Sequence, residues 1–235
     1  MKLNYQTQGS EAQGPPIVIL HGLFGSGDNW KSVAQELGER QRVLTPGLPN
    51  HGESPHTDRF DYREVAVDVA SFLGEIGVDR VILLGHSMGG KIAMSLALQR
   101  PELVEALIIA DIAPKRYDWR HQREFDAMEA VTAAGATNRR EADRAMAELI
   151  DSRPIRAFLL KNYRQGAQGS YGWRFNLPGV RDNYDKIIDW PEHNGSYVGP
   201  TLLIRGERSP YVEPGDEAIL ETLFPTAELV TIDDA

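Results

Sequence analysis

A serine stands at the centre of a glycine-rich turn between an apolar run and a helical pattern. Residues 81–90, VILLGHSMGG, carry the pattern Gly-x-Ser-x-Gly around Ser87. In such a sharp turn a nucleophile sits in strained backbone, and the glycines avoid collisions with neighbouring elements. The positive end of the following helix would be directed at Ser87, and the backbone N–H of Met88 could stabilise a developing oxyanion. The segment predicts a nucleophilic serine; the alternative is a glycine-rich turn that contains an incidental serine.

A second apolar run, residues 17–20, leads into the loop HGLFG at residues 21–25. A loop at the end of such a strand commonly supplies the other oxyanion donor from its backbone. We assign this donor to the N–H of Leu23 and expect Phe24 to line an acyl pocket. His21 could be mistaken for a catalytic base, but we favour a structural role in which its ring holds the loop through a hydrogen bond.

Length and composition narrow the class of protein. The 235 residues suffice for one well-filled domain with an inserted lid but not for a second independent core. The net charge of -9 argues against nucleic-acid binding, and the absence of cysteine excludes disulfides, zinc–thiolate sites and a cysteine nucleophile. The sequence has no signal-type leader and no apolar stretch of membrane-spanning length, so we expect a soluble cytoplasmic protein without membrane association.

Short apolar runs alternate with helical patterns along the chain. This alternation is typical of an α/β fold with a mostly parallel sheet that is covered by helices on both faces. A helix after Ser87 should end before Pro101, and residues 2–7 fit an antiparallel edge strand. The predicted strands are Ile17–Leu20, Arg42–Thr45, Val81–Leu84, Ala106–Ala110, Thr201–Arg205 and Ala227–Ile232.

The pattern changes between residues 114 and 190, where three helical segments and no clear strand are predicted. The helical segments are Arg123–Ala133, Asn138–Asp151 and Pro154–Tyr163. Thr137 is the expected N-cap of the second segment. A helical insertion between two strands, at the edge where the strands end, is typical of a lid over a pocket. We therefore predict a core of residues 1–113 and 191–235 and a helical lid of residues 114–190.

Six segments together resemble a known family. They are, in chain order, HGLFGSGDNW, NHGESPH, GHSMGGK, ADIAP, WRFNLP and SPYV. Over essentially its whole length the chain is similar to α/β-hydrolases, in particular to bacterial short-chain acyl esterases and thioesterases and to their mitochondrial abhydrolase relatives. The resemblance implies the α/β-hydrolase fold and a serine hydrolase that cleaves small acyl esters or thioesters through a Ser-Asp-His triad and an acyl-enzyme. It implies no metal and no organic cofactor.

The acid of such a triad has several candidates. In most α/β-hydrolases it follows the strand after the lid, but that position holds Ser209 here. The resemblance implies that the acid is Asp111, which ends the strand before the lid, and that Ser209 assists it. The acid orients the base that activates the nucleophile. The alternative is that Asp111 caps the following turn, which would leave Glu207, Glu213 or Asp216 as the acid.

The general base is the member of the triad without an obvious residue. In this fold the base is a histidine in the loop after the last strand, and the last predicted strand is followed by only three residues, which end at Ala235. We therefore expect the base in a Gly-His pair just beyond Ala235, followed by a closing helix. The alternatives are His121 or His193, which flank the lid, and a binding module that lacks a base.

Aromatic residues that could form an apolar pocket lining lie in the lid and in the loops. They are Phe24, Tyr117, Trp119, Trp173, Phe175 and Tyr211. Each of them alone is more often an ordinary core residue. A lyase or a C–C bond hydrolase of the same fold could use a similar pocket and remains a second alternative for the function.

Four cations stand at the start of the lid, namely Lys115, Arg116, Arg120 and Arg123. A cluster of this kind could receive the phosphates of an acyl-CoA thioester. The simpler interpretation is a solvated helix face that acidic neighbours partly neutralise. The expected ligand is in either case a small acyl ester or thioester, and we make no prediction of the oligomeric state.

Overall fold

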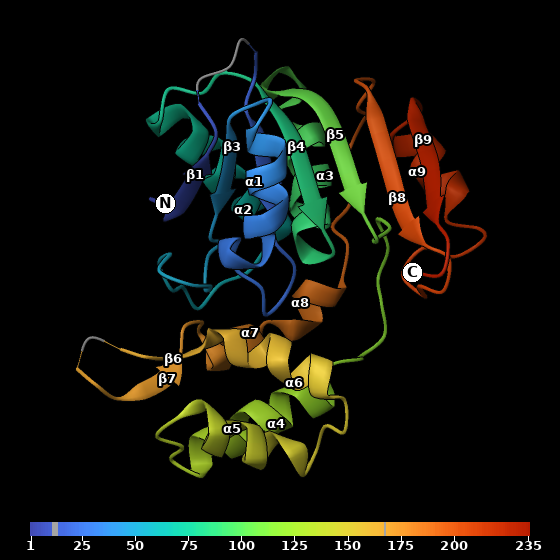
Figure 1. Cartoon of the computed structure of the whole chain (residues 1–235). Helices are drawn as coiled ribbons and strands as arrows, with labels where there is room; N and C mark the ends of the chain where they lie inside the picture. The colour runs from blue at the N-terminus through green and yellow to red at the C-terminus, as the bar shows by residue number, and fades with distance from the viewer. Residues whose placement is uncertain (11–13, 167) are drawn as a thin grey trace.

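A seven-stranded sheet forms the centre of the protein. The computed structural model describes residues 1–10, 14–166 and 168–235. The strand order is β1-β3-β2-β4-β5-β8-β9, in which β1 runs antiparallel to β3 and the other neighbours are parallel (Figure 1). The mostly parallel sheet and its antiparallel edge strand are confirmed. The strands are β1 (Tyr5–Gln8), β2 (Ile17–Leu20), β3 (Val43–Pro46), β4 (Val81–His86), β5 (Val104–Ala110), β8 (Thr201–Gly206) and β9 (Ala227–Ile232).

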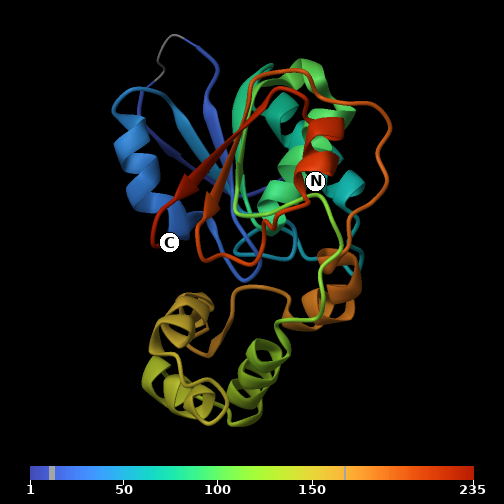
Figure 2. The same cartoon turned by 90° about the vertical axis from the view of Figure 1, so that its right-hand side faces the viewer.

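Helices cover both faces of this sheet, as predicted. The helices of the core are η1 (Gly27–Trp30), α1 (Lys31–Gly38), α2 (Tyr62–Glu75), α3 (Met88–Gln99), η2 (Pro101–Leu103) and α9 (Glu217–Leu223). Helix α1 lies on one face, whereas α2, α3 and α9 lie on the other (Figure 2). Helix α3 ends before Pro101, where the proline disfavours helical backbone in the preceding residue. Within the described ranges, no helix has the length and apolar character that crossing a membrane requires.

The central strands are buried because both of their faces are covered. In β2, the side chains of Val18, Ile19 and Leu20 have no exposed surface. The main hydrophobic core lies between the sheet, α2 and α3 and continues into the lid, and a smaller cluster around Ile19 and Val43 lies under α1. Strands buried on both faces read as continuous apolar runs, which is why the sequence predicts them well.

The residues between β5 and β8 form a separate layer across the carboxyl ends of the strands (Figures 1 and 2). Its elements are α4 (Gln122–Ala133), α5 (Arg139–Ala147), α6 (Arg153–Leu159), η3 (Leu160–Asn162), β6 (Tyr163–Gln165), β7 (Tyr171–Trp173), α7 (Leu177–Asp182) and α8 (Tyr184–Ile188). Helices α4, α5 and α6 correspond to the three predicted helical segments. This layer corresponds to the predicted lid, by which name we refer to it, and it lies across the carboxyl edge of the sheet (Figures 1 and 2).

The expectation that the lid contains no strand is wrong. Strands β6 and β7 pair as an antiparallel hairpin in which Tyr163 lies opposite Trp173, with 4.9 Å between the ring centroids. Each strand has only three residues, which is too short for the alternation that identifies a strand in a sequence. The indole N–H of Trp173 donates to the carbonyl of Met128 at 3.2 Å and so ties the hairpin to α4.

The N-cap of α5 also differs from the prediction. The side chain of Asn138, not of Thr137, accepts hydrogen bonds from the N–H groups of Arg140 at 3.1 Å and Glu141 at 3.0 Å. Thr137 instead donates its backbone N–H and its hydroxyl to the carboxylate of Glu141. Both residue types can cap a helix, so the sequence alone did not separate these neighbours.

Candidate active site

Ser87 lies in strained backbone at the junction of β4 and α3. Its φ is 51° and its ψ is -120°, and a positive φ is uncommon for residues other than glycine. The N–H of Ser87 donates to the carbonyl of Ala110 at 3.0 Å, and the carbonyl of Ser87 accepts from the N–H of Gly90 at 2.8 Å. The predicted strand, turn and helix are confirmed. Such strain persists only where neighbouring contacts fix the backbone, so these contacts define the position of the Ser87 hydroxyl.

Three glycines of this turn are required by the close approach of other atoms. A Cβ on Gly85 would lie 2.6 Å from the Cα of Gly90, and a Cβ on Gly89 would lie 2.6 Å from the carbonyl oxygen of His21. A Cβ on Gly90 would lie 2.5 Å from the Cγ2 of Ile112. Any side chain at these positions would push α3 away from β2 or from the chain after β5. The glycines therefore allow the N-terminus of α3 to approach the carboxyl edge of the sheet.

The register of the strands brings Ser87 next to Asp111. His86 of β4 pairs with Ala110 of β5, so Ser87 and Asp111 are the first residues beyond the paired ends. The N–H of Asp111 donates to the carbonyl of Ile204 in β8 at 2.8 Å. Both side chains line the same cavity. The parallel strands thus deliver a hydroxyl and a carboxylate to one place.

The carboxylate of Asp111 accepts two hydrogen bonds from the segment that follows β8. The hydroxyl of Ser209 donates to Oδ2 at 2.7 Å, and the N–H of Gly206 donates to Oδ1 at 3.4 Å. These bonds fix the orientation of the carboxylate. The contact between Ser209 and Asp111 is the one that the resemblance implies.

The three fallback acids have other partners. Glu213 and Asp216 bind the ammonium group of Lys115 at 2.6 and 2.8 Å, and Glu207 accepts a hydrogen bond from the N–H of Asp234 at 3.1 Å. None of the three lines the cavity next to Ser87. Asp111 is therefore the acid candidate that the geometry favours.

The loop after β2 packs directly against Ser87. A hydrogen bond of 3.0 Å between its ends closes a turn over residues 22–25, in which Phe24 has a φ of 58°. A Cβ on Gly22 would lie 3.3 Å from the Cβ of Ser87. Leu23, the predicted oxyanion donor, lies inside this turn, and its side chain lines the cavity.

Two buried side chains hold this loop in place. His21 Nδ1 donates to the carbonyl of Gly22 at 2.9 Å, and its Nε2 accepts from the N–H of Leu48 at 3.1 Å. Burial lowers the pKa of His21 to about 3, so the ring is neutral. The two hydrogen bonds use both of its nitrogens. The structural role of His21 is confirmed. The side chain of Asn162 in η3 donates to the carbonyl of Phe24 at 2.6 Å, a contact that no sequence pattern indicated.

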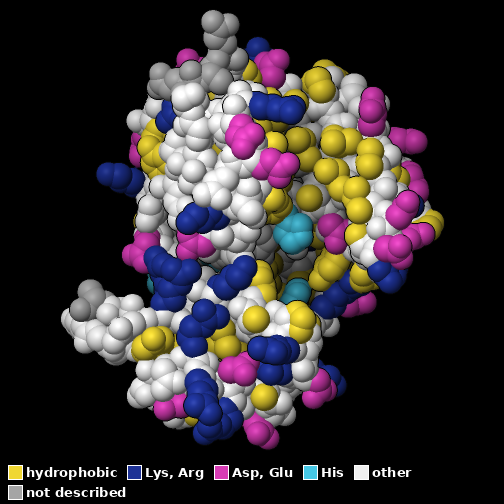
Figure 3. Space-filling view, viewed as in Figure 1, with side chains coloured by type: hydrophobic (Ala, Val, Ile, Leu, Met, Phe, Trp, Pro, Cys, Tyr) yellow, Lys and Arg dark blue, Asp and Glu magenta, His cyan; other side chains and the backbone are white. Residues whose placement is uncertain are grey.

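A cavity of about 570 Å³ opens between the core and the lid at Ser87. Figure 3 shows a hollow between the two parts, with histidine side chains visible in it. Its walls include apolar side chains from η1, α1, α6 and the loop after β2, namely Leu23, Phe24, Trp30, Val33, Ile155, Phe158 and Leu159. A cavity of this size and character can hold the apolar part of a small molecule.

A narrow branch of about 40 Å³ leaves the same place. It shares Leu23, Ser87, His121 and Tyr211 with the main cavity. Its other walls include the polar or charged residues Tyr62, Lys91, Tyr117, Asp118, Arg120 and Tyr184, although most of the surface that lines the branch is apolar. The site therefore has a large and a small compartment that meet at Ser87.

Lys91 is a buried cation in the wall of this branch. The residue is 1% exposed, and its ammonium group donates to the carbonyls of Ile188 at 3.0 Å and Asp189 at 2.8 Å. Burial lowers the pKa of Lys91 to about 7, although the charge of Asp189 acts in the opposite direction. Sequence reasoning missed this residue. The pattern that could have indicated it is a single lysine among the mostly small and apolar residues 88–97.

The predicted aromatic lining is found in part. Phe24 and Tyr211 line the main cavity and Tyr117 lines the branch, whereas Phe175 is a core residue packed against Phe24 with 5.8 Å between the ring centroids. Trp119 and Trp173 line neither compartment, contrary to the prediction.

Each of these two indoles has a partner elsewhere in the lid. Trp119 is 45% exposed, and its indole N–H donates to Asp185 Oδ1 at 2.9 Å. The indole of Trp173 faces α4, where its N–H also meets the hydroxyl of Thr132 at 3.1 Å. An indole N–H usually requires a partner when it leaves water, and these partners draw both rings away from Ser87.

No imidazole in the described part of the chain hydrogen-bonds Ser87 or Asp111. His86 and His121 line the cavity, and burial lowers the pKa of each. His121 Nδ1 bonds the hydroxyl of Tyr184 at 2.5 Å. His193 lies outside the cavity, where its ring centroid is 4.9 Å from that of Trp190.

The four cations at the start of the lid do not form one cluster. Lys115 pairs with Glu213 and Asp216, and Arg116 contacts Asp185 at 3.5 Å and Asp189 at 3.3 Å. The acids that neutralise them come from α8, from the residue after it and from the segment before α9. This arrangement contradicts a joint phosphate site, and it leaves Arg120 and Arg123 without a carboxylate partner in the described part of the chain.

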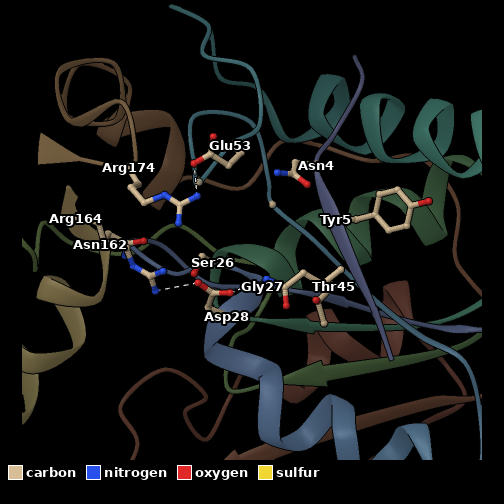
Figure 4. A pocket seen from close by; sticks show the side chains of 13 residues that line it. Asn4, Tyr5, Ser26, Gly27, Asp28, Thr45, Glu53, Asn162, Arg164 and Arg174 are labelled. Atoms are coloured by element: carbon tan, nitrogen blue, oxygen red, sulfur yellow. Dashed lines mark hydrogen bonds and ion pairs between the residues drawn. The ribbon is translucent and has the colours of Figure 1, made fainter. Parts of the chain in front are cut away.

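A second, polar pocket of about 80 Å³ lies on the other side of the loop after β2, beneath the lid hairpin (Figure 4). Arg164 of β6 pairs with Asp28 at 2.9 Å, and Arg174, just after β7, pairs with Glu53. Because both arginines have acidic partners, this pocket serves as a contact between hairpin and core. It lies apart from Ser87.

Known proteins resemble this chain over its whole length. A family model of the alpha/beta hydrolase fold matches residues 15–235. The sn-1-specific diacylglycerol lipase ABHD11 of Mus musculus is 38% identical over 100% of this chain and 79% of its own length, and esterase YbfF of Escherichia coli (strain K12) is 35% identical over 97% and 88%. The structure of a marine microorganism esterase matches with a TM-score of 0.95 and 35% identity, over 100% of this chain and 92% of that chain. The chain therefore belongs to the α/β-hydrolase family.

Proposed function

We propose that this chain is a serine hydrolase that cleaves small acyl esters through an acyl-enzyme on Ser87. The observation that carries the proposal is the setting of Ser87. This serine has strained backbone and opens onto a largely apolar cavity beside Asp111, whose carboxylate accepts two hydrogen bonds. The names of the relatives, which are an esterase and a lipase, support the same chemistry.

The proposed reaction begins with attack of Ser87 Oγ on the carbonyl carbon of the ester while a general base takes its proton. The N–H groups of Leu23 and Met88 stabilise the oxyanion, with help from the positive end of α3. The alcohol then leaves with the proton from the base, and the acyl group stays on Ser87 as an ester. Water, activated by the same base, attacks this ester, releases the carboxylic acid and restores the serine.

In this mechanism Asp111 orients the base and stabilises its protonated form. The hydroxyl of Ser209 supports Asp111 through the bond of 2.7 Å to Oδ2. A hydrogen bond to a charged group contributes about 1.5–3 kcal/mol, so Ser209 can set the direction of the carboxylate without itself touching the substrate.

For the base we propose a histidine from the loop after β9, where this fold carries it. The carbonyl carbon of Ala235 would lie 2.9 Å from a Cβ on Gly206, and the N–H of Gly206 donates to Asp111. An imidazole that follows Ala235 would therefore be close to the acid. The alternative is His121, which lines the cavity but uses Nδ1 for its bond to Tyr184.

We favour ordinary esters over acyl-CoA thioesters as substrates. A CoA thioester carries several phosphate charges, and recognition of these needs cations that are free to bind them. Lys115 and Arg116 are each held by two carboxylates. The apolar walls of the main cavity suit a short hydrocarbon group.

The test is labelling of the complete protein with a fluorophosphonate probe, combined with hydrolysis of a short p-nitrophenyl ester. Wild type should react with the probe and turn over the ester. Ser87→Ala should lose the label and about 10⁶ in kcat, whereas Ser71→Ala, on the exposed surface of α2, should retain both. A wild-type protein that neither reacts nor hydrolyses the ester would refute the proposal, and full activity in Ser87→Ala would refute the assigned nucleophile.

A further inference from the structure

Three cations surround the ring of Tyr117 in the wall of the narrow branch. The ammonium nitrogens of Lys91 and Lys115 lie 4.7 and 5.4 Å from the ring centroid, and the guanidinium carbon of Arg120 lies 5.6 Å from it. The guanidinium carbon of Arg120 is also 5.2 Å from the ring centroid of Tyr211. Aromatic faces attract cations, but the cations repel one another, so this arrangement favours negative charge nearby.

Only one of these cations has carboxylate partners. Lys115 is bound by Glu213 at 2.6 Å and by Asp216 at 2.8 Å. The hydrogen-bond acceptors of Lys91 are two backbone carbonyls. Arg120 forms no ion pair with any described residue. The charge of Asp189 acts on Lys91 and raises its pKa against the effect of burial. Arg120 is therefore the cation of the branch without a matching anion in the described part of the chain.

The acidic side chains near the branch do not supply that anion. Asp118 lines the branch, but it is exposed and makes no described ion pair with Arg120. Asp111 lies in the main cavity and accepts its hydrogen bonds from Ser209 and Gly206. Arg120, which is also exposed and forms no described ion pair, is the cation that remains for a group that enters the branch.

A group in this branch would lie very close to the reacting atoms. Ser87, Leu23 and Met88 are part of its wall. Its volume of about 40 Å³ corresponds to roughly three water-sized positions. A carboxylate has three heavy atoms and fits this space. The larger apolar cavity begins at the same serine and can take the other half of an ester.

We infer that the narrow branch binds a carboxylate of the ester substrate, with Arg120 as its main ligand and the amino group of Lys91 beneath it. This inference rests on the proposed ester hydrolysis and names the substrate class. The substrate is a small ester with one apolar half and one half that ends in a carboxylate. It is either a monoester of a dicarboxylic acid or an ester of a hydroxy acid. The planar guanidinium of arginine suits a carboxylate because it can donate two parallel hydrogen bonds.

The experiment compares matched pairs of neutral and anionic esters in a pH-stat with the complete protein. Monoethyl succinate against ethyl butanoate tests a carboxylate on the acyl half. 3-Acetoxypropanoate against propyl acetate tests a carboxylate on the alcohol half. Wild type should prefer the anionic member of one pair in kcat/KM, and that pair identifies the half that enters the branch. No preference in either pair would overturn the inference and leave ester hydrolysis intact.

Arg120→Gln should reduce this preference about tenfold or more, because it removes the charge-assisted hydrogen bonds to the carboxylate. Arg123→Gln is the matched control, because Arg123 is exposed on the first turn of α4 and does not line the branch. Retention of the full preference in Arg120→Gln would overturn the inference.

A binding measurement separates this inference from the proposed function. Calorimetric titration of Ser87→Ala with monoethyl succinate and 3-acetoxypropanoate needs no turnover. At least one of them should bind Ser87→Ala about tenfold more tightly than it binds Ser87→Ala/Arg120→Gln. Equal affinities for both variants would overturn the inference whatever the esterase activity. If this difference in affinity is found but the wild-type protein hydrolyses no ester, only the proposed function is refuted.

Discussion

Replacement of Lys91 by methionine should change how the stability of the protein depends on pH. Lys91 is 1% exposed in α3, and its ammonium group contacts the carbonyls of Ile188 and Asp189 without a carboxylate at hydrogen-bonding distance in the described chain. Methionine has a similar length and no charge, so Lys91→Met removes the titration while it keeps most of the packing.

The size of the effect follows from the pKa of Lys91. Burial lowers this pKa from 10.5 to about 7 in the folded protein, whereas the unfolded chain keeps the ordinary value. Between these values the unfolded chain binds a proton that the folded chain does not bind, so the stability of wild type rises with pH in this window. One pKa unit corresponds to about 1.4 kcal/mol. The full penalty is about 5 kcal/mol below pH 7, and about 2 kcal/mol of it should disappear between pH 7 and pH 9.

The assay is urea unfolding of wild type and Lys91→Met at pH 7, 8 and 9. The free energy of unfolding of the variant minus that of wild type should fall by about 2 kcal/mol over this range. Lys31→Met, at the exposed start of α1, removes the same formal charge and should show a constant difference. Lys91→Gln, which can still donate to the two carbonyls, should show the same pH dependence as Lys91→Met and should be the more stable of the two if loss of those bonds weakens the fold.

Two results would contradict this reasoning. A difference between Lys91→Met and wild type that stays constant from pH 7 to pH 9 would mean that burial does not penalise the ammonium group. A variant that is less stable than wild type by the same amount at pH 7 and pH 9 would mean in addition that the ammonium group of Lys91 stabilises the folded protein, for example through Asp189. Either result would mean that Lys91 keeps its charge in the folded protein over this pH range.

Two further predictions concern the acid and the glycine-rich turn around Ser87. Asp111→Asn should lower kcat on an acyl ester by about 10⁴-fold, and Ser209→Ala should lower it by about tenfold. Glu207→Gln should match wild type. Equal rates for Asp111→Asn and Glu207→Gln would refute the assigned acid. Gly89→Ala should cost about 3 kcal/mol in urea unfolding because its Cβ would meet backbone of the preceding loop. Gly74→Ala, whose Cβ would contact nothing within 4 Å, should change stability by less than about 1 kcal/mol, and similar losses in both variants would refute this packing argument.

The sequence predicts the sheet and the glycine-rich turn around Ser87 well because the patterns that identify them lie in neighbouring residues. The strands that lie between covered faces are uninterrupted apolar runs, and the pattern around Ser87 occupies five consecutive residues. The placement of Asp111 beside Ser87 required one further step, which is the resemblance of the segment ADIAP to the family. The strand register then brings the two residues together.

The parts that were missed depend on contacts between distant segments. Lys91 meets the carbonyls of residues about a hundred positions away, and Lys115 meets Asp216 across a similar separation. Tryptophan is a residue type that can line a pocket, but the indole N–H groups of Trp119 and Trp173 find partners in the lid. No pattern of neighbouring residues carries such information, so these pairings required the folded chain.

The order of strands in the sheet also affects how the protein folds during synthesis. Strand β5 pairs on one side with β8, yet roughly 90 residues, which include the lid, separate their ends in the chain. A ribosome needs roughly 5–20 s for such a segment. During this time the outer edge of β5 has unpaired backbone groups and apolar side chains that attract other strands. The nascent chain therefore passes through an interval in which β4 and β5 can already position Ser87. The segment that hydrogen-bonds Asp111 does not yet exist at that time. During the same interval a chaperone would find β5 accessible.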